Sequence, residues 1–548
     1  DQNRRSGNFK PTIWNHEYIL SLINEEYSEE NYIKRASELR QQVEKLVRKE
    51  MEEKSVTETL KLVDALHKLC LSYLFENEIK NIMSRAYERN REEEMEGRRD
   101  LYSVALEFRL LRQYGYNISQ DVFDGFKDEE GEFDRDLSYN NLALLELYEA
   151  SFTSMPGEET LERARNFAAG RLRREREDES DETVSTLVQR ALEMPIHWIP
   201  VRCNTAWFID IYERRTDFTN SEVLDLAKLN FNILQAQHQQ ELKHISNWWK
   251  ETRLAEELPF ARDRLVECYV WTMRVPFPAG YSHLRTMIAK ANQLVTIIDD
   301  IFDIYGAVEE LRLFNDAIRS WDSEEIEKLP DYMKTCFFEL NRFVDETACV
   351  VQKEQGINVV QILRKSWGDL CGSYMKEAMW YSTGYTPNLE EYIDNAWISV
   401  SGPLVLTHSY VFLAKPISDE AIRRLSENPH DLIMNVGLVM RLANDLGTSP
   451  DEMERGDVAK SIQCCARETG SSIEEARERV REAMNEAWKE LNAAAMDGRV
   501  PFPEVFVRHA VELGRMAMHV YEKGDGFGTG NRDWKRSLTQ LFFEPLPL

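Results

Sequence analysis

Apolar residues recur three or four positions apart along most of this chain, with polar residues between them. The segment 102–111 places Tyr, Ala, Leu and Phe side chains at this spacing, and 223–234 repeats the pattern. Because an α-helix completes one turn in about 3.6 residues, such spacing gives each helix one apolar face. Strict alternation bounded by turn dipeptides, the mark of strands, is nearly absent. The pattern predicts an all-α fold.

Polar and helix-breaking residues mark the expected helix ends. A serine at 471–472 with a glutamate three residues later is typical of a helix start, and Asp497-Gly498 is expected to end that helix. Charged runs at 91–100 and 173–183 predict solvated loops or helix ends. The polar patch 214–221 is the best candidate for a domain boundary.

Composition limits the class of protein. A chain of 548 residues, 43% of them apolar, is expected to form at least two domains. No stretch approaches about 18 consecutive apolar residues, so we expect no membrane span. The net charge of -28 argues against nucleic-acid binding, and an anionic substrate would need a local metal or arginine cluster. The eight cysteines lack CxxC or CxxH spacing and are expected to be reduced core thiols.

Three carboxylates interrupt an apolar helix in LVTIIDDIFDIY, residues 294–305. At about 100° per residue, Asp299 and Asp303 share one face and Asp300 turns away from them. A solvated acidic stripe is the ordinary alternative in so acidic a chain. Burying bare carboxylates among apolar neighbours is costly unless a cation compensates, and hard oxygen donors favour Mg²⁺ or Mn²⁺.

A second group of polar residues lies in MRLANDLGTSPDE, residues 440–452. Asn444, Thr448 and Glu452 are spaced so that a helix would place their oxygen donors within an arc of about 80°. A helix end with a polar cap is the alternative, because glycine and proline interrupt the segment. Two oxygen-donor groups on apolar helices of one chain favour a metal site over the ordinary alternative for each.

Cations that could hold an anionic leaving group occur near both segments. Arg262 and Arg264 lie in FARDR, Arg441 lies within the second segment, and Lys460 follows it. The planar guanidinium fork suits bidentate phosphate recognition. Taken alone, each of these residues is more often a surface charge.

Together these motifs resemble the paired metal motifs of plant terpene synthases, with DDIFD at 299–303 followed by NDLGTSPDE at 444–452. The resemblance extends over essentially the whole chain and includes RGDVAKSIQC at 455–464. Arg4-Arg5, followed after eight residues by Trp14, resembles the tandem-arginine motif of the angiosperm monoterpene branch, which includes limonene, cineole and bornyl diphosphate synthases.

The resemblance implies an N-terminal arm over the active site (1–20), a helical barrel without its own active site (21–217) and a C-terminal class I catalytic barrel (218–548). It implies Mg²⁺, with Mn²⁺ possible, as the cofactor. The residues implied at the metals are Asp299, Asp300, Asp303, Asn444, Thr448 and Glu452, with Asp300 in a lesser role. Those implied at the substrate are Arg262, Arg264, Arg441 and Lys460, together with Arg4 and Arg5 of the arm.

The candidate catalytic residues also come from the resemblance. Trp271 matches the tryptophan of the cavity floor, whose ring could stabilise a cation by roughly 0.5 to 2 kcal/mol, although a plain core tryptophan is the alternative. Tyr521 and Asp525 lie at a glycine-rich stretch, 524–530, that could close as a lid. Asn292 matches an asparagine of limonene- and cineole-type enzymes, and we hypothesise that it positions a water or a proton acceptor.

The function implied is that of a monoterpene synthase, a carbon–oxygen lyase that ionises geranyl diphosphate, isomerises it to linalyl diphosphate and forms a cyclic or acyclic product. Alternatives with the same fold are a sesquiterpene synthase acting on farnesyl diphosphate and an isoprene synthase acting on dimethylallyl diphosphate. A catalytically silent helical scaffold is the alternative from another class. A trans-prenyltransferase would need two aspartate-rich motifs, whereas the second motif here is Asn-Thr-Glu.

The remaining expectations are coarser. The first half lacks a DxDD motif, so cyclisation started by protonation is not expected. Plastid residence is expected from the monoterpene resemblance alone, and the opening DQNRRSGNF, which lacks the apolar core of a secretory signal, is expected to belong to a mature form. The chain is expected to be a monomer or a homodimer.

Overall fold

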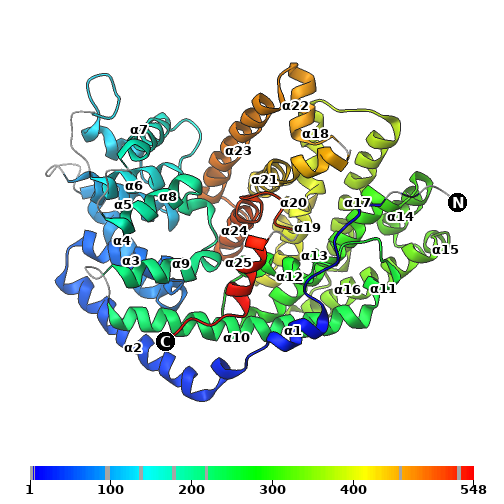
Figure 1. The fold of residues 1–548 in the computed structure, drawn as a ribbon, viewed down its shortest axis with the longest axis horizontal. Helices are drawn as coiled ribbons and strands as arrows, with labels where there is room; N and C mark the ends of the chain where they lie inside the picture. The colour runs from blue at the N-terminus through cyan, green and yellow to red at the C-terminus, as the bar shows by residue number, and fades with distance from the viewer. Residues whose placement is uncertain are drawn as a thin grey trace. The chain divides into compact units, whose positions relative to one another are not determined.

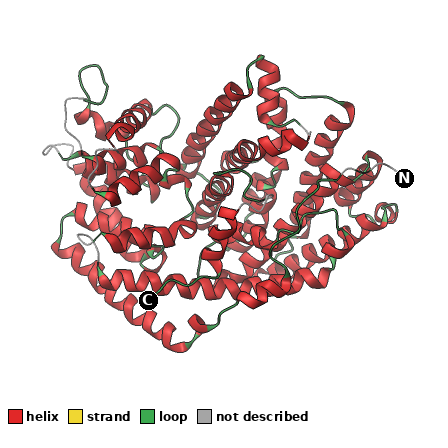
Figure 2. Cartoon of the chain, in the orientation of Figure 1, coloured by secondary structure: helices red, strands yellow, loops and turns green. Residues whose placement is uncertain are grey.

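The computed structural model describes residues 4, 6–92, 99–134, 140–175, 181–215, 220–455, 459–527 and 532–548. These residues form helices joined by loops, without a strand among them and with one isolated bridge between Lys127 and Phe133 (Figure 2). The predicted all-α fold is confirmed.

The chain forms two compact units. Residues 24–236 and 544–548 make one, here called the N-terminal unit, and residues 1–23 and 237–543 make the other, the C-terminal unit. The division falls within helix α10 (Ser221–Thr252), whereas the sequence places a boundary in the polar patch before this helix. Residues 216–219 of that patch lie outside the described residues, and the domain limits at 20/21 and 217/218 stay predictions.

The N-terminal unit is built from helices around a core of leucine, valine and phenylalanine side chains. Its helices are α2 (Glu30–Glu53), α3 (Val56–Lys68), α4 (Glu76–Glu92), α5 (Leu101–Gln113), α6 (Asn141–Ser151), α7 (Glu159–Glu175), α8 (Glu182–Glu193) and α9 (Val201–Arg214) (Figure 1). Asp100 and Asn140 start α5 and α6 by accepting from the backbone N–H groups of Ser103 and Ala143. Nearly every residue of these two helices is buried, so they form the centre of the unit.

A buried ion cluster joins three of these helices. The Arg109 guanidinium donates from Nε to Glu146 over 3.0 Å and from Nη2 to Asp64 over 2.8 Å, and Arg109 is only 2% exposed. Because an unpaired charge at this depth is strongly destabilising, the paired carboxylates are what makes the arginine tolerable. The charged groups of this cluster are therefore paired with one another inside the N-terminal unit.

The C-terminal unit contains the remaining helices. They are α1 (His16–Leu22), α11 (Leu254–Glu257), α12 (Leu265–Val270), α13 (Ser282–Asp300), α14 (Val308–Ser320), α15 (Ser323–Glu327), α16 (Asp331–Gln355), α17 (Val360–Thr383), α18 (Leu389–Ser399), α19 (Gly402–Leu413), α20 (Asp419–Ser426), α21 (Asp431–Arg455), α22 (Ser461–Thr469), α23 (Ile473–Met496), α24 (Glu504–Tyr521) and α25 (Arg532–Phe542) (Figure 1). The predicted capping box of α23 is present between Ser472 and Glu475, and the helix ends before Asp497 as expected.

One expectation about composition needs correction. Cys349 is exposed on α16, so it is not a core thiol, whereas six of the other cysteines are buried. One described helical stretch, Leu389–Leu413, has the length and composition of a membrane span. Since 67% of its most apolar window is buried inside the protein, interior packing accounts for this composition.

Candidate active site

A cavity of about 610 Å³ lies within the C-terminal unit. Its walls come from α13, α17, α19, α21 and α24, together with the N-terminal segment 6–10. This volume is in the range of small-molecule binding sites. The cavity gathers most of the residues that the sequence singles out.

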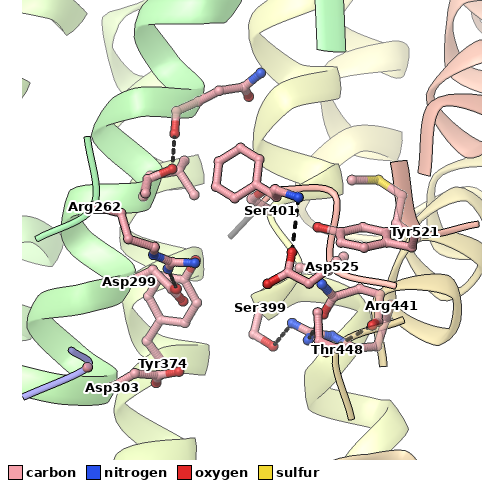
Figure 3. Close-up of a pocket in the computed structure, with 18 of the residues that line it drawn as sticks. Arg262, Asp299, Asp303, Tyr374, Ser399, Ser401, Arg441, Thr448, Tyr521 and Asp525 are labelled. Atoms are coloured by element: carbon pink, nitrogen blue, oxygen red, sulfur yellow. Dashed lines mark hydrogen bonds and ion pairs between the residues drawn. The ribbon is translucent and has the colours of Figure 1, made fainter. Parts of the chain in front are cut away.

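The first acidic residues lie where α13 changes its hydrogen bonding. The α-helix ends at Asp300, and residues 301–305 continue as a single π-helical turn. Asp299 and Asp303 both line the cavity (Figure 3). Ile301 and Phe302, between them in sequence, are buried in the core. Two carboxylates are therefore presented to the cavity from an otherwise apolar segment.

Asp300 does not line the cavity and is bound to Arg262 instead. It is 1% exposed and accepts from the Arg262 backbone N–H over 2.7 Å and from Nε over 2.9 Å. Burial raises the pKa of the Asp300 carboxyl to about 6, and the Arg262 guanidinium opposes that rise. Arg262 also donates from Nη2 to Asp299 over 2.6 Å (Figure 3). Asp300 thus orients the arginine at the cavity wall, and its role at a metal stays a prediction.

The second group of oxygen donors lies on α21. This helix continues through Gly447 and Pro450 to Arg455, so the alternative of a polar helix end is wrong. Asn444 and Thr448 line the cavity, as the four-residue spacing predicts for one helix face. Glu452 belongs to the same helix, but its side chain lies outside what the structure describes.

Gly447 explains how α21 approaches the end of α24. A Cβ at this position would lie 2.9 Å from the Tyr521 Cβ and 3.0 Å from the Tyr521 carbonyl oxygen. Both distances are too short for a side chain, so glycine permits the close approach. The approach brings Tyr521 next to the donors of α21.

Two of the predicted diphosphate ligands lie beside this wall. Arg441 is 7% exposed and donates from Nη1 to the Asn444 Oδ1 over 3.0 Å and from Nη2 to the Ser399 hydroxyl over 3.2 Å. Lys460 is buried and lines the cavity. Arg264 does not line it; its Nη2 donates to the Lys10 carbonyl over 2.9 Å and so binds the N-terminal arm.

The N-terminal arm is anchored by Arg4. Its guanidinium makes a bidentate pair with Glu310, over 2.8 and 2.9 Å, and lies 4.5 Å from the centre of the Tyr305 ring. Residues 6–10 then run along the cavity. Arg5 lies outside the described residues. The arm is therefore held next to the π-helical turn that carries Asp303.

The glycine-rich segment contributes Asp525, which lies next to Tyr521 (Figure 3), and Phe527 also lines the cavity. The Phe527 backbone N–H donates to Asp525 over 3.0 Å, and the Phe527 ring centre lies 5.9 Å from the Arg262 guanidinium. Gly528 and Gly530 lie outside the described residues, so closure of a lid stays a prediction.

The rest of the lining is more apolar. Trp271 is buried, with its ring centre 6.1 Å from that of Tyr521, and Val295, Val405 and Leu513 line the same cavity. Asn292 also lines it, and its Nδ2 donates to the Cys268 carbonyl over 3.2 Å. An aromatic and aliphatic surface thus adjoins the charged wall.

Sequence patterns miss several residues of this site. Tyr374 and Glu377 come from α17, and Glu377 accepts from the Ser399 hydroxyl over 2.5 Å. Ser399 in turn accepts from Arg441, so Glu377 helps to orient that guanidinium. Arg274, after Trp271, also lines the cavity. No spacing rule identifies these residues, because α17 carries other charged side chains, including Asp369 and Lys376, among which Glu377 does not stand out.

The donor set fits divalent metal ions that are completed by a substrate. Carboxylate, amide and hydroxyl oxygens line one cavity, beside cations that suit a diphosphate. Within the described residues, no group of three His, Cys, Asp or Glu side chains is close enough to hold an ion alone. The oxygens of a bound diphosphate and water would supply the remaining ligands.

Comparison with known proteins agrees with this geometry. The model of the terpene synthase family metal-binding domain matches residues 250–490, and that of the terpene synthase N-terminal domain matches residues 13–192. The (-)-alpha-terpineol synthase of Vitis vinifera is 46% identical, over 99% of this chain and 91% of its own length. Several other relatives, 43–44% identical, have names that include "chloroplastic".

Two solved structures are similar over the full length. Limonene synthase with 2-fluorolinalyl diphosphate has a TM-score of 0.95 and 44% identity, and the match covers 99% of this chain and 100% of that one. Isoprene synthase from grey poplar leaves (Populus x canescens), in complex with three Mg²⁺ ions and dimethylallyl-S-thiolodiphosphate, has a TM-score of 0.88 and 36% identity, covering 98% and 99%. Shared sequence over the whole length, a shared fold and a metal-binding domain lead to one conclusion: the chain belongs to the terpene synthase family.

Proposed function

We propose that this terpene synthase ionises geranyl diphosphate, isomerises it through linalyl diphosphate and converts the carbocation to a cyclic or acyclic monoterpene. One observation carries the proposal: Asp299 and Asp303 on one wall and Asn444 and Thr448 on another line a single cavity that also has an aromatic surface. The limonene synthase likeness supports a C10 substrate more strongly than the lower identity to isoprene synthase supports a C5 one.

The metal is proposed to be Mg²⁺, with Mn²⁺ as the substitute. Asp299, Asp303, Asn444, Thr448 and Glu452 would hold it. When bound, it supplies positive charge that stabilises the leaving diphosphate. The magnesium complex of the isoprene synthase supports this choice of ion.

The chain's own cations would complete the binding of the leaving group. Arg262 is held by Asp300 and Asp299, and Arg441 by Ser399 and Asn444, so both guanidinium groups are positioned before a substrate arrives. Such preorganised groups stabilise developing charge without reorganising. Lys460 and the arm residue Arg5 are assigned to the same task by family resemblance.

The other walls would act on the carbocation. Trp271 presents a ring whose negative face favours positive charge. Tyr521, Asp525 and the arm residues 6–10 would exclude bulk water once the substrate is bound, which protects the cation from unselective capture. Asn292 is assigned a role in positioning a water or a proton acceptor.

The substrate assignment is tested by separate incubations with geranyl, farnesyl and dimethylallyl diphosphates, each with Mg²⁺ or with EDTA. The organic overlay is analysed by gas chromatography and mass spectrometry. We expect a Mg²⁺-dependent C10 product from geranyl diphosphate. Product from farnesyl or dimethylallyl diphosphate but not from geranyl diphosphate would refute the C10 assignment. No product from folded protein with any of the three substrates would favour the catalytically silent scaffold. Plastid residence, supported by the chloroplastic relatives, is tested by localising the native protein in fractionated leaf tissue.

A further inference from the structure

Arg274 is a buried cation in the cavity wall that none of the roles above uses. It lines the cavity and is 4% exposed. Its Nη1 hydrogen-bonds to the ring of His509. Among the residues that the structure describes, no acceptor lies within hydrogen-bonding reach of Nε or Nη2. Buried guanidinium groups normally have their N–H donors paired, so these two donors call for an acceptor within the cavity.

Its place in the chain puts Arg274 at the end of the cavity remote from the diphosphate site. On α24, His509 lies twelve residues before Tyr521, a separation of about 18 Å along the helix axis. Tyr521 lies beside the donors of α21, whereas Leu513, one turn after His509, belongs to the apolar lining. The unpaired donors are therefore near the surface that would receive the hydrocarbon end of a prenyl diphosphate.

The charge on Arg274 is retained at neutral pH. Burial lowers the pKa of its guanidinium to about 9, and Glu512 opposes that change. Burial, followed by the charge of Arg274, lowers the pKa of His509 well below its usual range, so the imidazole is neutral and accepts from the guanidinium. A hydrocarbon chain offers no acceptor for the remaining N–H groups, but a water molecule does.

We infer that Arg274 is a positioning residue that holds a water molecule at the apolar end of the cavity, and that this water captures the final carbocation to give a monoterpene alcohol. The inference rests on the proposed function. Nε or Nη2 donates to the water oxygen, and the second lone pair of that oxygen faces the cation. A tertiary carbocation needs no base to react with water, so placement of the water selects alcohol over alkene.

The step balances without an oxidant or a further reactant. The water lone pair forms a carbon–oxygen bond with the cationic carbon. The resulting oxonium ion then loses one proton to solvent water. One prenyl diphosphate and one water thus give one alcohol, one diphosphate and one proton. The names of similar proteins do not decide this outcome, because α-terpineol is an alcohol and limonene is a hydrocarbon.

The test compares the wild-type enzyme with Arg274→Met and Arg274→Lys, each incubated with geranyl diphosphate and Mg²⁺ in H₂¹⁸O. From the wild type we expect an alcohol that carries ¹⁸O as the main product. Methionine removes the donors at similar length, so the alcohol share should fall about tenfold in favour of alkenes while diphosphate release continues. Lysine keeps a cationic donor and should retain part of the alcohol.

Controls separate this inference from the proposed function. Arg312→Met removes an exposed arginine that pairs with Glu309, and its products should match the wild type. Alkenes alone from the wild type, or an unchanged alcohol share in Arg274→Met, would overturn the inference and leave the C10 assignment intact. No diphosphate release from geranyl diphosphate by the folded wild type would overturn the proposed function instead. If circular dichroism shows that Arg274→Met does not fold, the test uses the ¹⁸O content of the wild-type product and the products of Arg274→Lys. An alcohol share in Arg274→Lys below a tenth of the wild-type share would also count against a donor role.

Discussion

Single residues of the site divide into those that bring oxygen to the cavity and those that hold other side chains in place. Asp299 and Asp303 belong to the first kind, because both line the cavity. Asp300 and Glu377 belong to the second, because each accepts hydrogen bonds from the group that it orients. Two neighbouring carboxylates, Asp299 and Asp300, are thus expected to respond differently to substitution.

Asp303→Asn tests the first kind of residue. The change keeps the volume but removes a negative charge from the proposed metal site, so we expect kcat/KM to fall about a thousandfold, equivalent to about 4 kcal/mol. Steady-state assays over a range of Mg²⁺ concentrations check this. Asp316→Asn, on the exposed side of α14, is the matched control. Equal activity in the two variants would contradict the proposed role of Asp303.

Among single residues, the sequence predicts the oxygen donors of the cavity better than it predicts the residues that hold them in place. Hard oxygen donors at helical spacing are conspicuous in an apolar segment, and this pattern identifies Asp299, Asp303, Asn444 and Thr448. Arg274 could not, because its environment is made by His509, which is 235 positions away. Contacts between distant segments leave no local pattern.

Among the larger elements, the N-terminal arm depends on one ion pair. Arg4→Ala removes a charge-assisted bidentate contact with Glu310, a contact worth about 1.5 to 3 kcal/mol. With the arm released, turnover of geranyl diphosphate should fall about tenfold, and turnover of linalyl diphosphate should fall less, because the family associates the arm with isomerisation. Glu310→Gln should behave alike, and the double variant should be no worse than either single one.

Arg312→Ala provides the control for the arm, since this arginine lies on the same helix as Glu310 but pairs with Glu309. It should leave both substrates unaffected. Independent, additive losses from Arg4→Ala and Glu310→Gln would show that the two residues act separately.

Helix α6 carries a pH-dependent element of stability. Burial raises the pKa of Glu149 to about 7 from an ordinary 4.5, although its carboxylate accepts from the Ile196 backbone N–H. The folded state therefore holds the proton more tightly than the unfolded state. The stability that this gives is complete below pH 4.5 and is lost as the pH rises through about 7, a change of about 3 kcal/mol.

Glu149→Gln should remove this dependence, because glutamine keeps the acceptor for Ile196 without the charge. At pH 8 the variant should be more stable than the wild type, by up to about 3 kcal/mol, and at pH 4.5 the two should be similar. Thermal unfolding followed by circular dichroism at several pH values measures the difference. Parallel curves for the two proteins would show that Glu149 does not titrate in this way.

Helical elements were the part of the fold that the sequence predicted best. The capping box at Ser472 has a local signature, and it occurs in the structure. The sequence does not predict the course of α21, because Gly447 and Pro450 are helix breakers by local preference. Packing against Tyr521 requires the glycine, so a tertiary contact overrides that preference.

The whole molecule is strongly acidic, yet it is proposed to bind an acidic ligand. With a net charge of -28, the average field opposes an approaching diphosphate. Arg262, Arg441 and Lys460 place positive charge in the cavity, but carboxylates line the same cavity and offset it. We therefore expect inorganic diphosphate and Mg²⁺ to bind well only together.

Thermal unfolding with Mg²⁺, with inorganic diphosphate and with both checks that expectation. Saturation by the pair at about 100 times Kd adds about 2.7 kcal/mol and should raise Tm by roughly 2 to 4 °C, whereas each component alone should add little. Asp303→Asn should lose the joint effect. A full shift with diphosphate alone would show that the cations suffice without metal.

The division of the oxygen donors between α13 and α21 has a consequence for control of the chemistry. Among the described residues, no group of three His, Cys, Asp or Glu side chains is close enough to hold an ion alone, so under the proposed function the reactive arrangement would form only when cation and diphosphate bind together. The proposed site therefore requires both components at the same time. On this proposal, neither the metal ion alone nor the diphosphate alone forms the reactive site. Carbocations are therefore generated only when the substrate is bound together with the metal.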